Sequence, residues 1–335
     1  MMPAGDMNEQ WQKVIERRNQ VCEEFKSCGG TGSRAFAGVG ITLVVGEPKL
    51  IVFTSDIEAT KHAIATGPGH DWVDTVLFER SGGFAIPSGP PLARRLARWL
   101  KALLRPLTAD IDVGAGTEIA GARSGTVGCV LQDGGRTPYF LTAGHVLPRA
   151  GDVALHGRTP IGSVVNASTV LTGLDWSLVK ADQSAANPTD KIVYDPQLTL
   201  GHELAVGALQ QLPQETIGMS GAASKGRRRG TVVSVCTCLA VTELHGGDCK
   251  RYLFGDQVIV QDVPAAKRFG IPGDSGAVAY LLSDVTSSGI TYHPGTAIGL
   301  YWRADAARGL HALAPLADLL LAIQGVTNLQ LSVLP

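Results

Sequence analysis

The sequence predicts a mainly β fold that is preceded by a small α/β region and followed by a C-terminal helix. From residue 125 onward, short runs rich in β-branched and aromatic residues alternate with turn signals, which is typical of a barrel or a sandwich. Residues 132–136, Gln-Asp-Gly-Gly-Arg, separate two such runs and indicate a β-hairpin. Residues 313–323 carry apolar side chains at helical spacing, which predicts the final helix.

The predicted strands are short β-rich runs that are separated by turn signals. The hairpin strands are residues 125–131 and 137–142, and the second of them leads to His145. The remaining strands are predicted at residues 161–165, 177–180, 231–241, 257–261, 276–282 and 297–301.

The N-terminal part predicts a separate accessory domain. Apolar residues at helical spacing over 8–25 predict an amphipathic helix, and strands are expected at 37–45, 49–54 and 75–78. Residues 91–105 have a leucine-rich stripe opposite five basic side chains. We interpret them as a helix docked on the protein with a solvated basic face, in preference to a membrane-surface or partner helix. Residues 107–116, with Pro, Asp and Gly, are predicted to be a linker.

Length and charge exclude several classes of protein. A chain of 335 residues can form two or three domains and bury a large core. The formal net charge of −1 gives no bulk attraction to nucleic acid or membranes. The polar N-terminus and the lack of a long apolar run predict a cytoplasmic protein without a membrane span. Gly38-Val39-Gly40 lacks the third glycine of a nucleotide loop, and we expect no cofactor.

Six cysteines are present, and three of them cluster. Cys236, Cys238 and Cys249 lie close together with His245, but Cys-x-Cys is not the usual spacing of a zinc site. Buried thiols are the favoured interpretation, ahead of a redox pair and a metal site. On a regular strand, Cys236 and Cys238 would point to the same face.

Two short motifs carry the chemistry. Gly273-Asp274-Ser275-Gly276 holds a serine between glycines, and Thr142-Ala143-Gly144-His145 supplies a possible base. Asp175, flanked by apolar residues on a predicted strand, can orient that histidine. The chain order His, Asp, Ser is one of the convergent serine-triad arrangements. Asp152, Asp182 and Asp190 are alternative acids, but they lie in stretches that are predicted to be exposed loops.

The sequence resembles the trypsin-like serine peptidases of the chymotrypsin fold. The resemblance covers roughly residues 117–323 and is specific at the three motifs around His145, Asp175 and Ser275. It implies two six-stranded antiparallel β-barrels and a C-terminal helix. The long N-terminal extension and Ala297-Ile298-Gly299-Leu300 also resemble the intracellular group related to the plant narrow-leaf protease. We therefore expect an accessory domain over 1–106, a linker over 107–116, a protease domain over 117–325 and a tail over 326–335.

The same resemblance implies roles for further residues. The backbone N–H groups of Gly273 and Ser275 would form the oxyanion hole. In secreted relatives the residue equivalent to Asp274 pairs with a newly cleaved N-terminus, but this sequence has no evident Ile-Val-Gly-Gly processing site, so we expect a structural hydrogen-bonding role for Asp274. Phe269 would lie at the base of the specificity pocket, which argues against cleavage after Lys or Arg. An apolar preference is one hypothesis, and an acidic preference set by Arg303 is its rival. The implied substrate-binding residues are Phe269, Gly299, Tyr301 and Arg303.

The expected function is a serine endopeptidase that is regulated or narrowly specific inside the cell. Its partner would be a protein or peptide substrate, and a dedicated effector protein is one candidate. The alternative is a catalytically silent binding or scaffold protein on a protease fold. An esterase is disfavoured because Ala277 departs from the Gly-x-Ser-x-Gly elbow. The basic run at residues 224–230 is interpreted first as solvated surface and second as an exosite.

Overall fold

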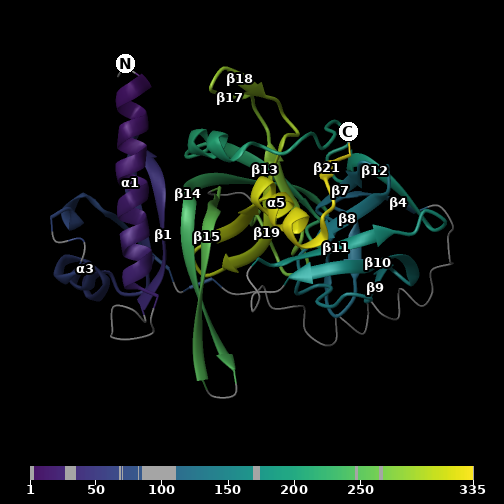
Figure 1. The fold of residues 1–335 in the computed structure, drawn as a ribbon, viewed down its shortest axis with the longest axis horizontal. Coiled ribbons are helices and arrows are strands. Elements are labelled where there is room, and N and C mark those ends of the chain that lie inside the picture. The colour runs from purple at the N-terminus through teal and green to yellow at the C-terminus, as the bar shows by residue number, and fades with distance from the viewer. Residues whose placement is uncertain are drawn as a thin grey trace.

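The fold is described by a computed structural model, which covers residues 4–26, 35–67, 69, 71–81, 83–84, 111–168, 174–245, 248–263 and 267–334 (Figure 1). Over these residues the protein is mainly β, and two large sheets hold most of its strands. In the described part of the chain, no helix has the length and apolar character needed to cross a membrane.

The C-terminal half builds a closed barrel of six strands. Neighbouring strands are all antiparallel, and β13 pairs with β14 as well as with β16, which closes the ring. Closure gives each of the six strands two antiparallel neighbours within the barrel. The order around the ring is β13 (Thr216–Gly221), β16 (Val278–Leu281), β19 (Ala297–Asp305), β20 (Leu310–Pro315), β15 (Asp248–Asp262) and β14 (Gly226–His245).

The other large sheet is an antiparallel sheet of eight strands. Seven come from residues 118–181, and the last is supplied by the C-terminus. Together the two sheets fit the double β-barrel of the chymotrypsin fold, as predicted. The order is β21 (Leu331–Val333), β7 (Cys129–Asp133), β8 (Pro138–Thr142), β11 (Trp176–Ala181), β10 (Thr159–Ser168), β9 (Val153–His156), β5 (Glu118–Ala120) and β6 (Ser124–Thr126).

The predicted hairpin is formed by β7 and β8. The Asp133 carboxylate accepts hydrogen bonds from the backbone N–H groups of Gly135 and Thr137, and Arg136 has a φ of 64°. Such side-chain-to-backbone bonds stabilise a tight turn. Because this turn sets the register of β8, it also determines where the chain reaches His145.

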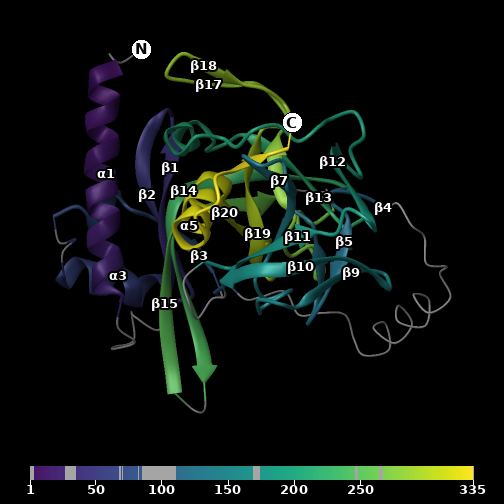
Figure 2. The same cartoon turned by 45° about the vertical axis from the view of Figure 1, so that its right-hand side comes forward.

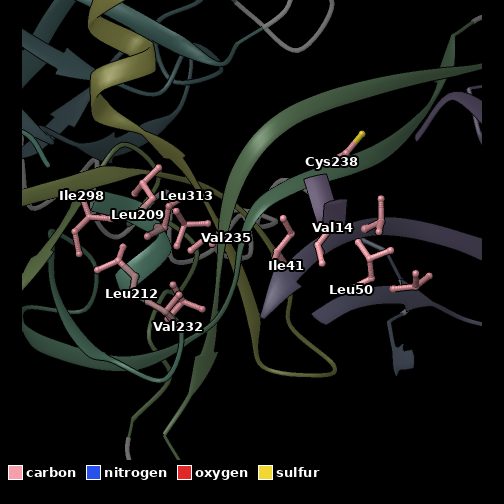
Figure 3. Close-up of a cluster of buried hydrophobic side chains, with 14 of the residues drawn as sticks. Val14, Ile41, Leu50, Leu209, Leu212, Val232, Val235, Cys238, Ile298 and Leu313 are labelled. Carbon is pink, nitrogen blue, oxygen red and sulfur yellow. The ribbon is translucent and has the colours of Figure 1, made fainter. Parts of the chain in front are cut away.

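The N-terminal elements extend the sheet of the closed six-stranded barrel. Strand β1 pairs antiparallel with β14, so one sheet runs from the barrel through the N-terminal strands (Figures 1 and 2). Val14 and Ile41 lie in the same buried cluster as Val235 of the barrel (Figure 3). The elements are α1 (Ala4–Glu24), β1 (Phe36–Val44), β2 (Glu47–Thr54), α3 (Ile57–Thr66), the 3₁₀ helix η1 (Val73–Thr75) and β3 (Leu77–Arg80).

The predicted linker and the predicted tail both contain strands in the structure. Residues 111–115, placed in the linker, form β4 (Ile111–Ala115), which pairs in parallel with β12 (Ala186–Ile192) because Val113 and Ala115 are buried. The predicted tail continues α5 (Leu316–Thr327) and then forms β21, which pairs with β7. The predicted basic helix at 91–105 and residues 107–110 lie outside the described residues. Helix α3 was not predicted.

Three shorter elements complete the described chain. They are the 3₁₀ helix η3 (Val206–Gln211) and the small antiparallel hairpin of β17 (Val285–Ser287) and β18 (Ile290–Tyr292).

The cysteine region of β14 is irregular. Cys236 has a φ of 48°, and the β14–β15 register shifts on both sides of Thr237, so simple alternation of side chains is interrupted. Cys238 is buried, and its thiol hydrogen-bonds Cys22 of α1, which together with burial raises the pKa of Cys22. Burial, followed by the charge of Asp256, raises the pKa of Cys236 to about 11. The thiols of Cys22 and Cys236 are therefore protonated at neutral pH.

Candidate active site

His145 and Asp175 are brought together by two paired strands. His145 follows the end of β8, Asp175 directly precedes β11, and Thr142 of β8 lies opposite Ser177 of β11. Asp175 Oδ2 lies 2.5 Å from His145 Nδ1, and Asp175 Oδ1 accepts the His145 backbone N–H at 2.9 Å. The Asp175 side chain is fully buried, whereas 9 % of the His145 side chain is exposed.

This pairing determines the orientation of the imidazole. A carboxylate oxygen accepts hydrogen bonds, so Nδ1 of His145 donates to Asp175 and Nε2 is left for a second partner. Gly144 permits the close approach, because a Cβ there would lie 2.0 Å from the Ser168 carbonyl oxygen and 2.9 Å from Asp175 Oδ1.

The three alternative acids are engaged elsewhere. Asp152 accepts the backbone N–H of Arg149, and Asp182 accepts both the backbone N–H and the hydroxyl of Ser184. Asp190 lies 3.5 Å from the neighbouring threonine hydroxyl. Of the four candidate acids, Asp175 is the one that hydrogen-bonds His145 in the described structure.

The loop that carries Ser275 packs against the chain leading to His145. Gly276 has a φ of 93°, and a Cβ there would lie 2.3 Å from Thr142 Oγ1 and 2.9 Å from the Ala143 nitrogen. The Ser275 carbonyl accepts the Thr126 N–H at 2.8 Å. The Ser275 loop therefore lies next to the residues just before His145. Among the described residues, no group hydrogen-bonds the Ser275 hydroxyl.

Gly273 and Asp274 shape the same loop. Gly273 has a φ of 100°, which a side chain would strain, and it lies against Ala223. The fully buried Asp274 accepts backbone N–H groups from Ala223 and Ser224 at 2.9 Å and from Ile271 at 3.1 Å. Burial raises the pKa of Asp274 although these hydrogen bonds oppose the shift. Asp274 therefore has the structural hydrogen-bonding role that was predicted.

Two of the predicted pocket residues, Phe269 and Tyr301, lie together in one buried cluster behind the Ser275 loop. Gly270 packs on the Tyr301 ring, and the Tyr301 carbonyl accepts the Gly276 N–H at 2.8 Å. Gly299 lies within the sheet, opposite Ala279 and Pro315.

His311 completes this cluster and was not predicted from the sequence. Its ring centroid lies 5.6 Å from that of Phe269 and 5.7 Å from that of Tyr301, and its Nε2 lies 2.8 Å from Asp262 Oδ1. Asp262 also accepts the Phe269 N–H at 2.6 Å. A histidine inside the apolar run 310–314 was the available signal.

Arg303 lies apart from Phe269 and Tyr301. Its guanidinium is buried over the Trp302 ring and donates to the Phe84 carbonyl at 3.3 Å. The β19–β20 register shifts between Tyr301 and Arg303, so the two side chains do not share a face as regular alternation would require. The prediction that Arg303 borders the pocket with Phe269 and Tyr301 is therefore corrected by this bulge.

No family model matches the chain, and no curated protein matches its sequence. The fold is similar to that of Thermobifida fusca Protease A, with a TM-score of 0.44 and 19 % identity over 66 % of this chain and 98 % of that chain. The fold is also similar to that of a Nocardiopsis protease, with a TM-score of 0.44 and 16 % identity over 66 % of this chain and 99 % of that chain. For Cellulomonas bogoriensis chymotrypsin the TM-score is 0.44 and the identity 18 %, over 67 % of this chain and 99 % of that chain. The membership of the narrow-leaf group stays a prediction.

Proposed function

We propose that the protein is a serine endopeptidase that hydrolyses peptide bonds through an acyl-enzyme. The observation that carries this proposal is the buried, doubly hydrogen-bonded pair of His145 and Asp175, against whose flanking residues the Ser275 loop packs. A serine at its ordinary pKa is a poor nucleophile, and an oriented histidine beside it is the arrangement that activates it.

In the proposed reaction, Ser275 Oγ forms a bond with the scissile carbonyl carbon while its proton passes to His145 Nε2. Asp175 holds the tautomer and stabilises the imidazolium. The backbone N–H groups of Gly273 and Ser275 stabilise the oxyanion, which typically contributes about 3–4 kcal/mol per donor. His145 then protonates the leaving amine as the C–N bond breaks, and water repeats the sequence to release the acid.

The proposal requires the Ser275 hydroxyl to turn toward His145 when substrate binds. Catalytic hydrogen bonds are often unformed in a ligand-free protein and tighten in the substrate complex. The lack of a hydrogen bond to the Ser275 hydroxyl among the described residues also favours the alternative, a catalytically silent binding or scaffold protein on a protease fold. The two functions predict different behaviour toward a reagent that reacts with activated serines.

The test is covalent labelling of the full chain by a fluorophosphonate. We expect one adduct per chain, mapped to Ser275 by mass spectrometry, and no adduct in Ser275→Ala. Ser177→Ala would be unsuitable as a control because this serine is buried, whereas Ser184→Ala changes an exposed residue and should label normally. Failure to label the wild-type chain, with hydrolysis absent for a broad peptide mixture, would favour the silent scaffold.

Regulation by the N-terminal region is part of the same proposal. Strand β19 continues from Tyr301, which bonds the Ser275 loop, to Arg303 and Asp305. The Ser81 hydroxyl donates to Asp305 Oδ2 at 2.9 Å, and the Phe84 carbonyl accepts from Arg303. These contacts support a restraint by which N-terminal residues cover the strand beside the nucleophile. Such restraint would suit a protease that acts inside the cell on a dedicated effector protein.

A further inference from the structure

Two basic segments, residues 225–229 and 267–268, meet beside the Ser275 loop. We call them the basic face, defined as Lys225, Arg227, Arg228, Arg229, Lys267 and Arg268. Gly230 follows the first segment and lies so close to Phe269 that a Cβ there would be 2.7 Å from the Phe269 ring. Phe269 directly follows the second segment. Arg228 is half-buried, and the other five residues are exposed.

The basic face is held firmly against the candidate active site. The turn that precedes it is bound by Asp274, which accepts the N–H groups of Ala223 and Ser224. Thr126 Oγ1 adds a bridge, because it donates to the Gly273 carbonyl and accepts the Ala222 N–H, both at 3.0 Å. In a strand rising roughly 3.4 Å per residue, Arg227 lies within about 14 Å of Ala223 along the chain.

Few acidic groups neutralise these cations within the described residues. Arg227 forms an ion pair with Asp195 at 3.2 Å, and the charge of Arg268 helps to lower the pKa of Asp262. Arg228 donates to the Ser224 carbonyl. None of the other three forms an ion pair in the described structure. A local positive excess therefore stands on a chain whose formal net charge is −1.

We propose that the basic face binds an acidic stretch of the protein substrate close to the bond that is cleaved. The inference rests on the proposed endopeptidase function and names the substrate class for that site. Charges of one sign that are fixed beside a site raise the local concentration of oppositely charged partners and select among them. An extended peptide spans about 14 Å with four or five residues, so a short acidic segment reaches from the site to the face.

The test measures binding to full-length Ser275→Ala, which does not depend on hydrolysis. The probes are a fluorescein-labelled peptide with four consecutive Glu residues and the same peptide with Gln at those positions. At low salt we expect the Glu peptide to bind about tenfold more tightly, with the advantage shrinking as salt rises. Fluorescence anisotropy gives both affinities.

Charge-reversed variants locate the effect. Adding Lys225→Glu, Arg229→Glu and Lys267→Glu should abolish the preference for Glu, and the milder Lys225→Gln with Arg229→Gln should reduce it. The control is Lys13→Glu with Lys61→Glu, which reverses two lysines of α1 and α3 and should leave the preference intact.

Three outcomes would overturn the proposal: equal affinity for the two peptides, a preference that survives the triple reversal, or displacement of the Glu peptide by a single-stranded DNA oligonucleotide of equal charge. Because the fluorophosphonate reports on Ser275 chemistry alone, a negative binding result with intact labelling would reject the basic face and retain the peptidase.

Discussion

At the residue scale, the proposed chemistry depends on one buried carboxylate. Asp175 uses one oxygen for the His145 ring and the other for the His145 backbone N–H, so the ring can neither turn nor move away. The pair is nearly removed from water, which strengthens its electrostatic interaction. The local arrangement needs Gly144, because any side chain there would meet the Ser168 carbonyl.

Replacing Asp175 by Asn tests its assigned role. The amide can no longer favour the tautomer in which Nδ1 of His145 carries the proton, and we expect kcat to fall by about 10⁴-fold, the loss typical of such triads. Peptide hydrolysis and the rate of fluorophosphonate labelling measure the effect. Asp182→Asn, at an exposed acid bonded to Ser184, should keep normal rates. Normal activity in Asp175→Asn would remove Asp175 from the mechanism.

A second residue-scale prediction concerns Asp262 and acid stability. Burial alone would raise the pKa of Asp262, but hydrogen bonds from His311 and the Phe269 N–H lower it overall. A carboxyl with a lowered pKa in the folded state stabilises the protein above its unfolded pKa of about 3.9. That stability is lost as the pH falls through the lower folded value.

Urea unfolding between about pH 6 and pH 2.5 measures this contribution. The free energy of unfolding of the wild type should fall more steeply below about pH 4 than that of Asp262→Asn, which has no carboxyl to titrate there. Parallel curves for the two proteins would show that the Asp262 carboxyl has no lowered pKa in the folded state.

At the scale of elements, β14 joins the barrel to the N-terminal strands. It pairs with β13, β15 and β1 along different parts of its length, and its irregular centre includes Cys236 with a φ of 48°. Asp256 of β15, next to the Gln257 that pairs with Thr237, has a φ of 57°. Arg18 of α1 bonds both, with Nη1 2.8 Å from the Cys236 carbonyl and 2.6 Å from Asp256 Oδ1. The helix therefore stabilises an irregular stretch that neither strand could stabilise alone.

Replacing Arg18 by Met should lower the free energy of unfolding by about 1–3 kcal/mol, because the Cys236 carbonyl and Asp256 lose a shared charged donor. Chemical denaturation followed by circular dichroism measures the change. Lys13→Met on the same helix removes an exposed pair with Glu9 and should change stability by less than about 0.5 kcal/mol. Equal effects of the two substitutions would contradict a specific role for Arg18.

At the scale of the whole molecule, the N-terminal region is continuous with the six-stranded barrel. β1 adds to β14, the hydrophobic cluster crosses the junction, and Ser81 and Phe84 contact β19. Figure 2 shows α1 and β1 on the side of the six-stranded barrel that faces away from the eight-stranded sheet. The domain boundary at residue 106 stays a prediction. The described residues before that boundary pack against the barrel and are not loosely tethered to it.

Loosening the contact between this region and β19 should raise activity if the region restrains the site. Ser81→Ala removes the hydroxyl that bonds Asp305, and Phe84→Ala removes a buried ring from the cluster that holds Trp302 of β19, although the Phe84 carbonyl remains. We expect the double variant to increase kcat/KM for a peptide substrate by about tenfold, which corresponds to a population shift of about 1.4 kcal/mol. Val333→Ala, in β21 of the other sheet, tests whether general destabilisation has the same effect. Unchanged or lower activity in the double variant would count against regulation by this contact.

Much of the fold was predictable because its signals are local. The β7–β8 hairpin follows from a turn sequence, and α1 and α5 follow from apolar residues at helical spacing. The C-terminal tail and the second half of the linker were mispredicted, since their strands are stabilised by distant partners, β7 and β12. At the site, His145 and Asp175 were found from short motifs, whereas His311 gave only one weak signal.

The sequence by itself determined the residue types of the candidate triad, their order and the β character of the chain, because reactivity and strand periodicity are written in neighbouring residues. Only the tertiary structure decided that β1 joins β14, that Arg303 packs beneath Phe84 instead of beside Phe269, and that two basic segments meet. Those outcomes depend on bulges and on pairing between strands far apart in the chain. A one-residue shift reverses which face a side chain occupies, and no local pattern records that shift.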